Sequence, residues 1–477
     1  MTLLGAFFIP LAIACFLLRP FYLLPLLVIS SVFEAGSVLN GVIGDFEFGI
    51  QPFYLIEMFI VLRLVMLRFG PAKLLPRRES PMRIVVLLLF AFWAWSVFSA
   101  FVMPHLFAGT LVSVPRNGGD SEFSPLVWNL SNLVQAGYLT LNVGTVLYAL
   151  HIVRTKLESE QLIKAIYWAA FIVVFIGFLQ FAAERGGWDF PYETFNSNPG
   201  YAMGFQEDIG SVHRFNSTFV EPSFAGSYLA AITCGLLASF LGGSRGVGRM
   251  VGLFGLTVML FLTTSTTGFS ALALGVFVLL LYFNPFRGQK DARKSSSLGW
   301  VVILVGFTIA GCVLILTPEL GEAILTSTVE KGESQSFWFR MANEFHSIQL
   351  LAETYGLGVG LGGNRSSGLI PTILSSVGIV GATLFTGMLF KITKLFPGRS
   401  ARSSIQMGFW ALVTMIISEI VAVPDINRPV LWALFTVVLS QLNVYLDQPA
   451  SVKPAQLGRT QPRRPPPRRS PSLAAAN

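Results

Sequence analysis

The chain has 477 residues, of which 53% are hydrophobic and only 12% are charged, and its mean hydropathy is +0.65. Soluble globular domains carry about a quarter charged residues, so this composition excludes a soluble fold and indicates a polytopic membrane protein. The three cysteines have no spacing suited to a metal site or a disulfide. We expect no metal and no cofactor.

Apolar segments close to the ~20 residues that cross a bilayer recur along the whole chain. They predict an all-α fold, a polytopic bundle of membrane-spanning helices. The first two segments, and likewise the eighth and ninth, could each be a short hairpin or one broken helix, so the expected number of spans is twelve to fourteen. The predicted spans are 3–18, 21–39, 53–67, 84–103, 133–153, 166–183, 218–241, 251–264, 269–283, 300–316, 369–390, 405–423 and 430–446.

The spans leave no separate soluble core, so we expect one transmembrane domain over residues 1–446. Residues 447–477 are basic and rich in proline, and such a composition cannot form a packed core. We expect this tail to be disordered near anionic lipid headgroups.

Most of the 33 Lys and Arg residues fall in every second loop and in the tail. Basic residues in short loops stay on the cytoplasmic side of a membrane. The net charge of +8 therefore reflects topology, and we do not expect nucleic-acid binding. Of the arginines in the opposite loops, we interpret Arg116, Arg185 and Arg428 as interfacial groups or loop salt bridges. The opposite loops hold Arg116, Arg185, Arg214, Lys331, Arg340, Arg365 and Arg428.

Two of the opposite loops are long, residues 184–217 and 317–368. Long loops are usually functional or disordered. In the first loop aromatic residues alternate with polar ones, a pattern that suits either the faces of sugar rings or anchoring at a membrane interface. The aromatic residues are Trp188, Phe190, Tyr192, Phe195, Tyr201 and Phe205.

The second long loop places Arg340, His346 and Arg365 around a glycine-rich stretch that includes Gly358 and Gly360. Glycines allow backbone N–H groups to approach an anion closely, although the same stretch could be a flexible linker before a helix. No GK[ST] follows, so this is not a Walker A loop.

The predicted helices near Thr218 and Leu369 both begin on the side of the long loops, and helix N-termini attract anions. An arginine precedes each helix, Arg214 in one case and Arg365 in the other. Together with Arg340 they provide fixed positive groups with the planar geometry that binds phosphate oxygens. These residues predict a pyrophosphate site.

Glu221 has two possible roles. The sequence from Thr218 to Glu221 fits a capping box, in which the carboxylate would satisfy N–H groups of the helix. Alternatively Pro222 is the first helical residue, and Glu221 then precedes the helix with its carboxylate available for chemistry. His213 and His346 are the histidines of the two long loops, and either is a base or an interfacial polar group.

Several motifs occur in a fixed order on the same side. R-x-x-S-T-x-x-E-P-S covers residues 214–223, S-x-x-x-R covers 336–340, and G-x-G-x-G covers 356–360 before a helix with G-I-x-G at 378–381. This pattern resembles the superfamily of O-antigen ligases and O-antigen or exopolysaccharide polymerases. Ligases of that superfamily carry a histidine where this chain has Ser367, so the resemblance favours the polymerase branch.

The resemblance implies a metal-independent, inverting glycosyltransferase in the bacterial inner membrane, with its active site on the periplasmic side. Its implied partners are a glycan donor on undecaprenyl pyrophosphate, a glycan acceptor, membrane lipids, a chain-length regulator and other polysaccharide-export proteins. It also implies that Arg214 and Arg340 hold the pyrophosphate. Glu221 is then the first candidate for the catalytic base and His346 the second.

Three alternatives remain open from the sequence. A ligase would transfer a finished chain to lipid A-core or another acceptor. A flippase or transporter would place ionisable or helix-breaking groups near the bilayer midplane in paired halves, and the sequence shows no internal repeat. An assembly or sensor protein would need no converging arginines.

Overall fold

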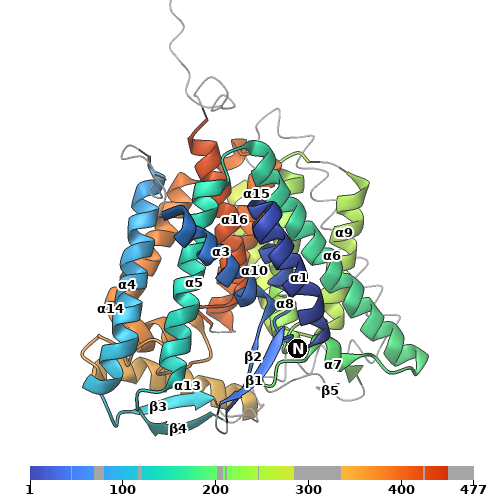
Figure 1. Cartoon of the computed structure of the whole chain (residues 1–477). Coiled ribbons are helices and arrows are strands. Elements are labelled where there is room, and N and C mark those ends of the chain that lie inside the picture. Colours follow the sequence, from blue (N-terminus) through green and yellow to red (C-terminus); the bar gives the residue numbers. More distant parts are fainter. Residues whose placement is uncertain are drawn as a thin grey trace, which may run out of the picture.

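The computed structural model describes residues 1–43, 46–68, 80–115, 121–200, 208–209, 212–244, 246–283, 335–422 and 425–448. These parts of the chain are mostly helical (Figure 1). The helices are α1 (Leu3–Leu18), η1 (Pro20–Tyr22), α2 (Leu23–Ser30), α3 (Pro52–Arg68), α4 (Met82–Leu106), α5 (Leu130–Ile152), α6 (Lys156–Gly186), α7 (Tyr192–Phe195), α8 (Pro222–Leu241), α9 (Val247–Leu262), α10 (Thr266–Phe283), α13 (Gln335–Glu353), α14 (Leu369–Leu395), η3 (Gly398–Ser400), α15 (Ser403–Val421) and α16 (Pro429–Leu446).

Three antiparallel two-stranded hairpins add to the helices and modify the expected all-α fold. They lie with α7 and α13 at one end of the bundle, the lower end in Figure 1, which we call the hairpin face. Each hairpin lies in a connection between two helices. The hairpins are β1 (Leu39–Ile43) with β2 (Phe46–Ile50), β3 (Leu111–Pro115) with β4 (Ser121–Pro125), and β5 (Asp208–Ile209) with β6 (Val212–His213).

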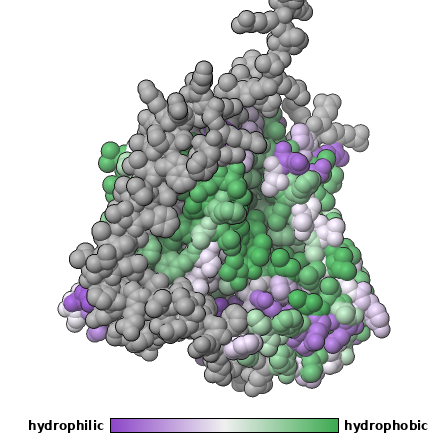
Figure 2. Space-filling model, turned by 180° about the vertical axis from the view of Figure 1, so that it is seen from behind, coloured by the Kyte–Doolittle hydropathy of each residue, from purple (hydrophilic) through white to green (hydrophobic). Residues whose placement is uncertain are grey.

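Eight of the described helices are long and apolar enough to cross a membrane, namely α4, α5, α6, α8, α10, α14, α15 and α16. Three shorter apolar segments, α1, Pro20–Ser30 and α9, accompany them. Figure 2 shows apolar side chains across the middle of the visible described surface and polar ones toward its ends. The protein is therefore a multi-pass helical membrane protein. The predicted span 300–316 lies outside the described residues, and the total of twelve to fourteen spans stays a prediction.

The predicted span 21–39 is wrong. Helix α2 ends at Ser30, and β1 begins at Leu39. Ser30 and Ser31 each turn their hydroxyl back onto a backbone carbonyl of the last helical turn, and the chain then leaves the helix. An eight-residue helix rises about 12 Å, far short of the ~30 Å of a bilayer core.

Helices also occupy parts of the predicted long loops. Helix α6 continues to Gly186, and α13 forms within residues 317–368. Asn343 on α13 donates to the backbone carbonyl of Arg365 at 3.3 Å, and Ser347 accepts from the side chain of Asn364 at 3.0 Å. These bonds fix α13 against the end of the same loop.

Helix α8 lies at the centre of the bundle because small residues let its neighbours approach closely. A Cβ at Gly226 would lie 2.7 Å from Ser265, and one at Gly235 would lie 2.6 Å from the carbonyl oxygen of Met407. Helix–helix association in a membrane depends on such close packing, since lipid tails are as apolar as leucine. Helices α10 and α15 therefore enclose α8 and fix the position of its first turn.

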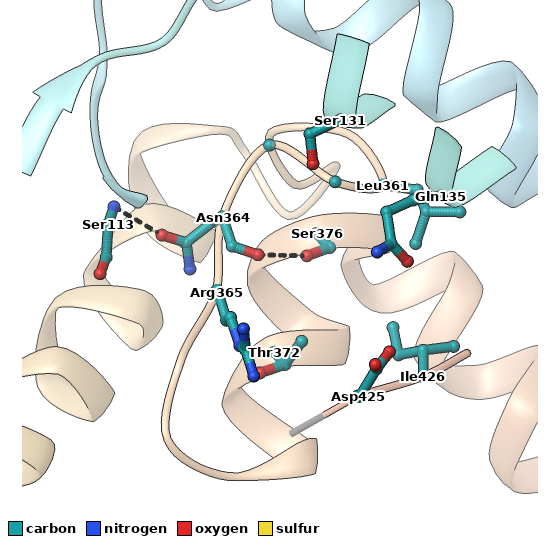
Figure 3. A pocket seen from close by; sticks show the side chains of 12 residues that line it. Ser113, Ser131, Gln135, Leu361, Asn364, Arg365, Thr372, Ser376, Asp425 and Ile426 are labelled. Carbon is teal, nitrogen blue, oxygen red and sulfur yellow. Dashed lines mark hydrogen bonds between the residues drawn. The ribbon is translucent and has the colours of Figure 1, made fainter. Parts of the chain in front are cut away.

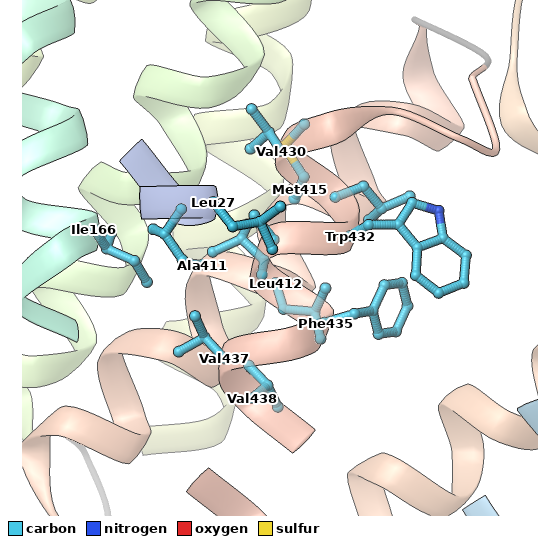
Figure 4. Close-up of a cluster of buried hydrophobic side chains, with 14 of the residues drawn as sticks. Leu27, Ile166, Ala411, Leu412, Met415, Val430, Trp432, Phe435, Val437 and Val438 are labelled. Atoms are coloured by element: carbon cyan, nitrogen blue, oxygen red, sulfur yellow. The ribbon is translucent and has the colours of Figure 1, made fainter. Parts of the chain in front are cut away.

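A second group of large apolar side chains holds α15 and α16 against α2 and α6 (Figure 4). Trp432 and Phe435 are almost completely buried here, and the indole N–H of Trp432 donates to the carbonyl oxygen of Ile426 at 2.7 Å. Removing either side chain should cost about 3–5 kcal/mol of folding free energy. The packing of α16 thus holds the chain just before it, residues 425–428, at the hairpin face.

The alternation of basic loops agrees with the course of the chain. The connections that follow α1, α5, α8 and α14 all lie at the end opposite the hairpin face (Figure 1). They carry Arg19, Arg154 and Arg399, and Arg249 follows in the first turn of α9, so four residues of the predicted cytoplasmic set lie at this end. Many others of that set, such as Arg245 and Arg293, lie outside the described residues.

This arrangement predicts opposite accessibility for the two ends. In a cysteine-free protein, single cysteines at Arg154 and Arg399 should resist a membrane-impermeant thiol reagent in intact cells. Cysteines at Arg214 and Arg365 should react, because those residues belong to the hairpin face. Labelling of the Arg154 site before membrane permeabilisation would contradict the topology, and labelling of both groups after permeabilisation is the control.

Candidate functional site

The start of α8 settles between the two roles considered for Glu221. Pro222 is the first helical residue, and Glu221 is the N-cap residue with extended backbone and no side-chain capping bond. The capping-box alternative is therefore wrong, because the hydroxyl of Thr218 donates to the carbonyl oxygen of Val32. The Glu221 carboxylate accepts a hydrogen bond from the Ser223 hydroxyl at 3.1 Å.

A buried amide holds the segment before α8 in a strained conformation. Ser217 has a φ of 53°, which is rare for a residue with a side chain. Gln180 of α6 accepts from its N–H at 2.9 Å and donates to its carbonyl at 3.2 Å, and the Ser217 hydroxyl donates to Val173 at 2.7 Å. A strained backbone of this kind persists only where surrounding contacts hold it in place. The bonds to Gln180 and Val173 therefore fix the path of the chain from Arg214 to Glu221.

An ion cluster contacts the first turn of α8. Arg428 is 1% exposed, and its guanidinium contacts the carboxylates of Glu34 and Glu419, which are 3% and 0% exposed. The Nε–Oε1 and Nη1–Oε1 distances are both 2.9 Å. The remaining nitrogen, Nη2, donates to the carbonyl oxygen of Phe224 in α8 at 2.9 Å, and the guanidinium lies 4.7 Å from the centre of the Phe224 ring.

This cluster corrects the interpretation of Arg428 as a possible interfacial group. The residue is a fully buried ionic centre, and the salt-bridge alternative is the one observed. Its partner Glu34 gave no signal in the sequence, because it lay within a segment that resembled one continuous span. The break after α2 is what brings Glu34 to the cluster, and Gln51 secures it by donating to the Glu34 carbonyl at 2.6 Å.

The C-terminal end of α15, at the hairpin face, lies between the starts of two helices. On one side, the hydroxyl of Ser418 is hydrogen-bonded to that of Ser227 in α8. On the other, a Cβ at Gly368, the N-cap of α14, would lie 3.0 Å from the carbonyl oxygen of Ile420. The N-termini of α8 and α14 are therefore neighbours across the end of α15, and the positive ends of both helix dipoles lie at the hairpin face.

Arg340 and Glu344 lie beside the N-terminus of α14. A Cβ at Gly368 would be 3.2 Å from Oε1 of Glu344, so this carboxylate occupies the region where the helix dipole favours an anion. Burial raises the pKa of Glu344, and the nearby Arg340 opposes that shift. Sequence reasoning missed Glu344, although its spacing of four residues from Arg340 on one helix was a readable signal.

The glycine-rich stretch packs between helices instead of forming the expected backbone cradle for an anion. Gly358 and Gly360 have φ values of 80° and 98°, and their N–H groups donate to the Thr354 hydroxyl at 3.0 Å and the Ser376 carbonyl at 2.8 Å. A Cβ at Gly360 would lie 2.7 Å from the carbonyl of Ser99 and 2.8 Å from Pro104. These positions need glycine for conformation and for space.

This packing leaves a cavity of about 140 Å³ at the hairpin face (Figure 3). Its walls come from β3, the N-terminus of α5, the end of the glycine-rich stretch, the first turns of α14, and the segment before α16. Arg365 and Asp425 extend from different walls in Figure 3, and no ion pair joins them within the described residues. The lining residues are Ser113, Ser131, Gln135, Leu361, Gly362, Gly363, Asn364, Arg365, Thr372, Ser376, Asp425 and Ile426.

Bonds within the protein use some of the polar groups of the cavity and leave others free. Asn364 accepts from the N–H of Ser113 at 2.9 Å and donates to two serine hydroxyls, so its amide is fully used. In the part of the chain that the structure describes, the buried hydroxyl of Ser113 and the guanidinium of Arg365 have no hydrogen-bond partner. Asp425 accepts a hydrogen bond from the N–H of Asn427 through Oδ1 at 2.9 Å, and its other carboxylate oxygen accepts none from the described residues.

Three other predicted site residues do not line this cavity. Nε2 of His346 donates to the carbonyl oxygen of Leu111 at 2.9 Å, and its ring lies edge-on to Phe123, so the histidine fastens α13 to the β3–β4 hairpin. His213 is 3.3 Å from the Tyr192 hydroxyl. Ser367 is half-buried just before α14.

No family model and no curated protein matches this chain. Over the described ranges, no group of three or more His, Cys, Asp or Glu side chains is placed to hold a metal ion.

The ion cluster predicts that removing Arg428 alone lowers the free energy of unfolding strongly, and that removing all three charges together restores most of it. Arg428→Ala leaves two buried carboxylates without their cation, and breaking a buried pair in this way costs about 3–5 kcal/mol. The triple variant Arg428→Met, Glu34→Gln, Glu419→Gln removes every charge and should recover most of the loss. Thermal unfolding of the purified protein in detergent measures both.

Arg399 is the matched control, since it is exposed and its guanidinium donates to the Tyr282 carbonyl at the opposite end of the bundle. Arg399→Ala should change the unfolding free energy by no more than about 1 kcal/mol. Equal losses for Arg428→Ala and Arg399→Ala would show that the cluster is unimportant for stability.

Proposed function

We propose that this protein polymerises glycan repeat units carried on undecaprenyl pyrophosphate, by inverting and metal-independent glycosyl transfer at the periplasmic face of the bacterial inner membrane. The observation that carries the proposal is the meeting of two helix N-termini at the end of α15, with Glu221 before one and Arg365 before the other. The resemblance in motif order to the O-antigen ligase and polymerase superfamily supports the same reaction.

The proposed donor site uses the positive groups of this face. Arg214 and Arg340 hold the pyrophosphate through charge-assisted bonds, while Arg365 lines the neighbouring cavity. The two helix dipoles add fixed positive potential at the same end. Because lipid pyrophosphate is already a good leaving group, charge neutralisation and orientation of the reactants supply most of the required stabilisation.

The proposed reaction has one chemical step. The acceptor hydroxyl oxygen bonds to the anomeric carbon of the donor while the bond from that carbon to the pyrophosphate oxygen breaks. The electron pair leaves with the pyrophosphate, and the hydroxyl proton passes to a carboxylate. Glu221 is the better candidate for this base, because it is half-buried and its carboxylate has only the Ser223 bond among the described residues, whereas Nε2 of His346 is held by Leu111.

A ligase would use the same donor chemistry, and the serine at position 367 in place of a histidine supports the polymerase. A transporter would draw support from the buried charges of Glu34, Glu419 and Arg428. Those groups are 3% exposed or less and face one another, whereas a transport path exposes its ionisable groups to water. The buried cluster thus favours a structural role over translocation.

The lipid-linked glycans of a deletion strain test the proposal. Loss of a polymerase should leave single repeat units on the lipid, loss of a ligase should leave long unattached chains, and no change would contradict both. Complementation with Arg214→Ala or Arg340→Ala should fail at normal protein level, and lysine should not restore full function because it lacks the bidentate fork. Arg185→Ala is the control, since Arg185 is exposed and stacks on Phe181.

Glu221→Gln separates a catalytic from a structural role. Glutamine can still accept the Ser223 bond but cannot remove a proton, so the variant should be folded and abundant while polymer forms about 10²-fold more slowly. The measurement is the initial rate of polymer formation, corrected for protein level. Glu193→Gln, an exposed change near the same face, should behave as wild type. Full activity of Glu221→Gln would remove Glu221 from the mechanism.

A further inference from the structure

The cavity at the hairpin face has the size of one six-membered ring. Its volume is about 140 Å³. For comparison, a well-known engineered cavity of roughly 150 Å³ binds one benzene molecule. That cavity is apolar, whereas seven residues with polar side chains and Arg365 line this one.

The lining offers both donors and acceptors, as a ring that carries hydroxyl groups requires. Ser113 is 1% exposed, and its hydroxyl is buried with no partner among the described residues. A buried polar group without a partner is destabilising, so a ligand that forms a hydrogen bond with it recovers that free energy. Arg365 supplies guanidinium donors on one wall, and Asp425 supplies a carboxylate acceptor on another (Figure 3).

An anion such as pyrophosphate fits this cavity poorly. The Asp425 carboxylate would repel it, and the N–H groups of Gly358, Gly360 and Leu361 nearby already donate to Thr354, Ser376 and Ser99. A neutral polyol avoids this repulsion.

We propose that the cavity binds one pyranose ring of the acceptor glycan, with Asp425 accepting from its hydroxyl groups and Ser113 and Arg365 donating to its oxygens. This inference rests on the proposed function, because it assigns the acceptor for the same site. One short segment connects the cavity with the proposed base Glu221. Asp425 of this segment lines the cavity, and Arg428 of the same segment donates to the carbonyl of Phe224 in the first turn of α8.

The test uses the full-length protein in lipid nanodiscs and methyl glycosides as probes. The probes are the methyl pyranosides of glucose, galactose, mannose and rhamnose at millimolar concentration, with inorganic pyrophosphate as the anionic comparison. Saturation-transfer NMR reports their binding. At least one glycoside should bind the wild-type protein, and pyrophosphate should not compete with it for the cavity.

Three variants localise the binding. Asp425→Asn keeps an oxygen for the Asn427 N–H, and Ser113→Ala removes a hydroxyl that has no partner among the described residues, so both should fold. Each should weaken glycoside binding, Asp425→Asn by about tenfold or more because a hydrogen bond to a charged group is lost. Ser131→Phe fills the cavity from an exposed position and should abolish binding. Glu353→Gln, exposed on α13, is the control.

Absence of binding by every glycoside, or equal binding by wild type and all three cavity variants, would overturn the proposal. Its failure differs from failure of the proposed function. A deletion strain with unchanged lipid-linked glycans contradicts the glycosyltransferase while cavity binding can persist. Normal polymer formation by Asp425→Asn and Ser131→Phe contradicts the subsite while the transferase stands.

Discussion

The arrangement of the hairpin face depends on one buried arginine. Arg428 joins Glu34, Glu419 and the carbonyl of Phe224, which belong to the segment after α2, the end of α15 and the start of α8. Charges in such surroundings are stabilised only when they are paired with good geometry, because their desolvation costs several kcal/mol per ion. The cluster therefore admits one relative position of these elements, and the helix starts that form the site follow from it.

The hairpin face separates groups that hold the structure from groups that remain available. Gln180, Asn364 and the glycine-rich stretch form hydrogen bonds with other groups of the protein and so fix the backbone of the site. The guanidinium of Arg365 and the hydroxyl of Ser113 do not, within the described residues. Rigid surroundings with a few free polar groups are what a site needs if it is to orient two substrates without reorganising during the reaction.

Charge is distributed unevenly over the same face. The two carboxylates around Arg428 balance its charge, and Glu344 accompanies Arg340 at the start of α14. Arg365 has no such partner among the described residues, and it faces the cavity. The proposed donor and acceptor sites thus differ in a simple way, since the donor site collects cations and helix dipoles while the cavity combines one cation with one carboxylate and several hydroxyl groups.

The sequence by itself determined the class of protein, most helix positions and the end of the bundle at which the polar groups gather. These features follow from local patterns: apolar length predicts a membrane helix, and the placement of Lys and Arg predicts which loops share a side. The same local logic identified Pro222 as a possible first helical residue, and the structure shows that it is.

Only the tertiary structure decided which residues meet. Glu34 lies in an apolar segment and Arg428 in a predicted loop, and neither position indicated an ion pair. An ion pair between residues far apart in sequence leaves no periodic signal. The glycine-rich stretch resembled an anion cradle, yet the conformation of glycine serves close packing and ligand approach equally well, and only the positions of Ser99, Thr354 and Ser376 distinguish the two. The cavity lined by Asp425 could not be foreseen for the same physical reason: its walls come from five separate segments that packing alone brings together.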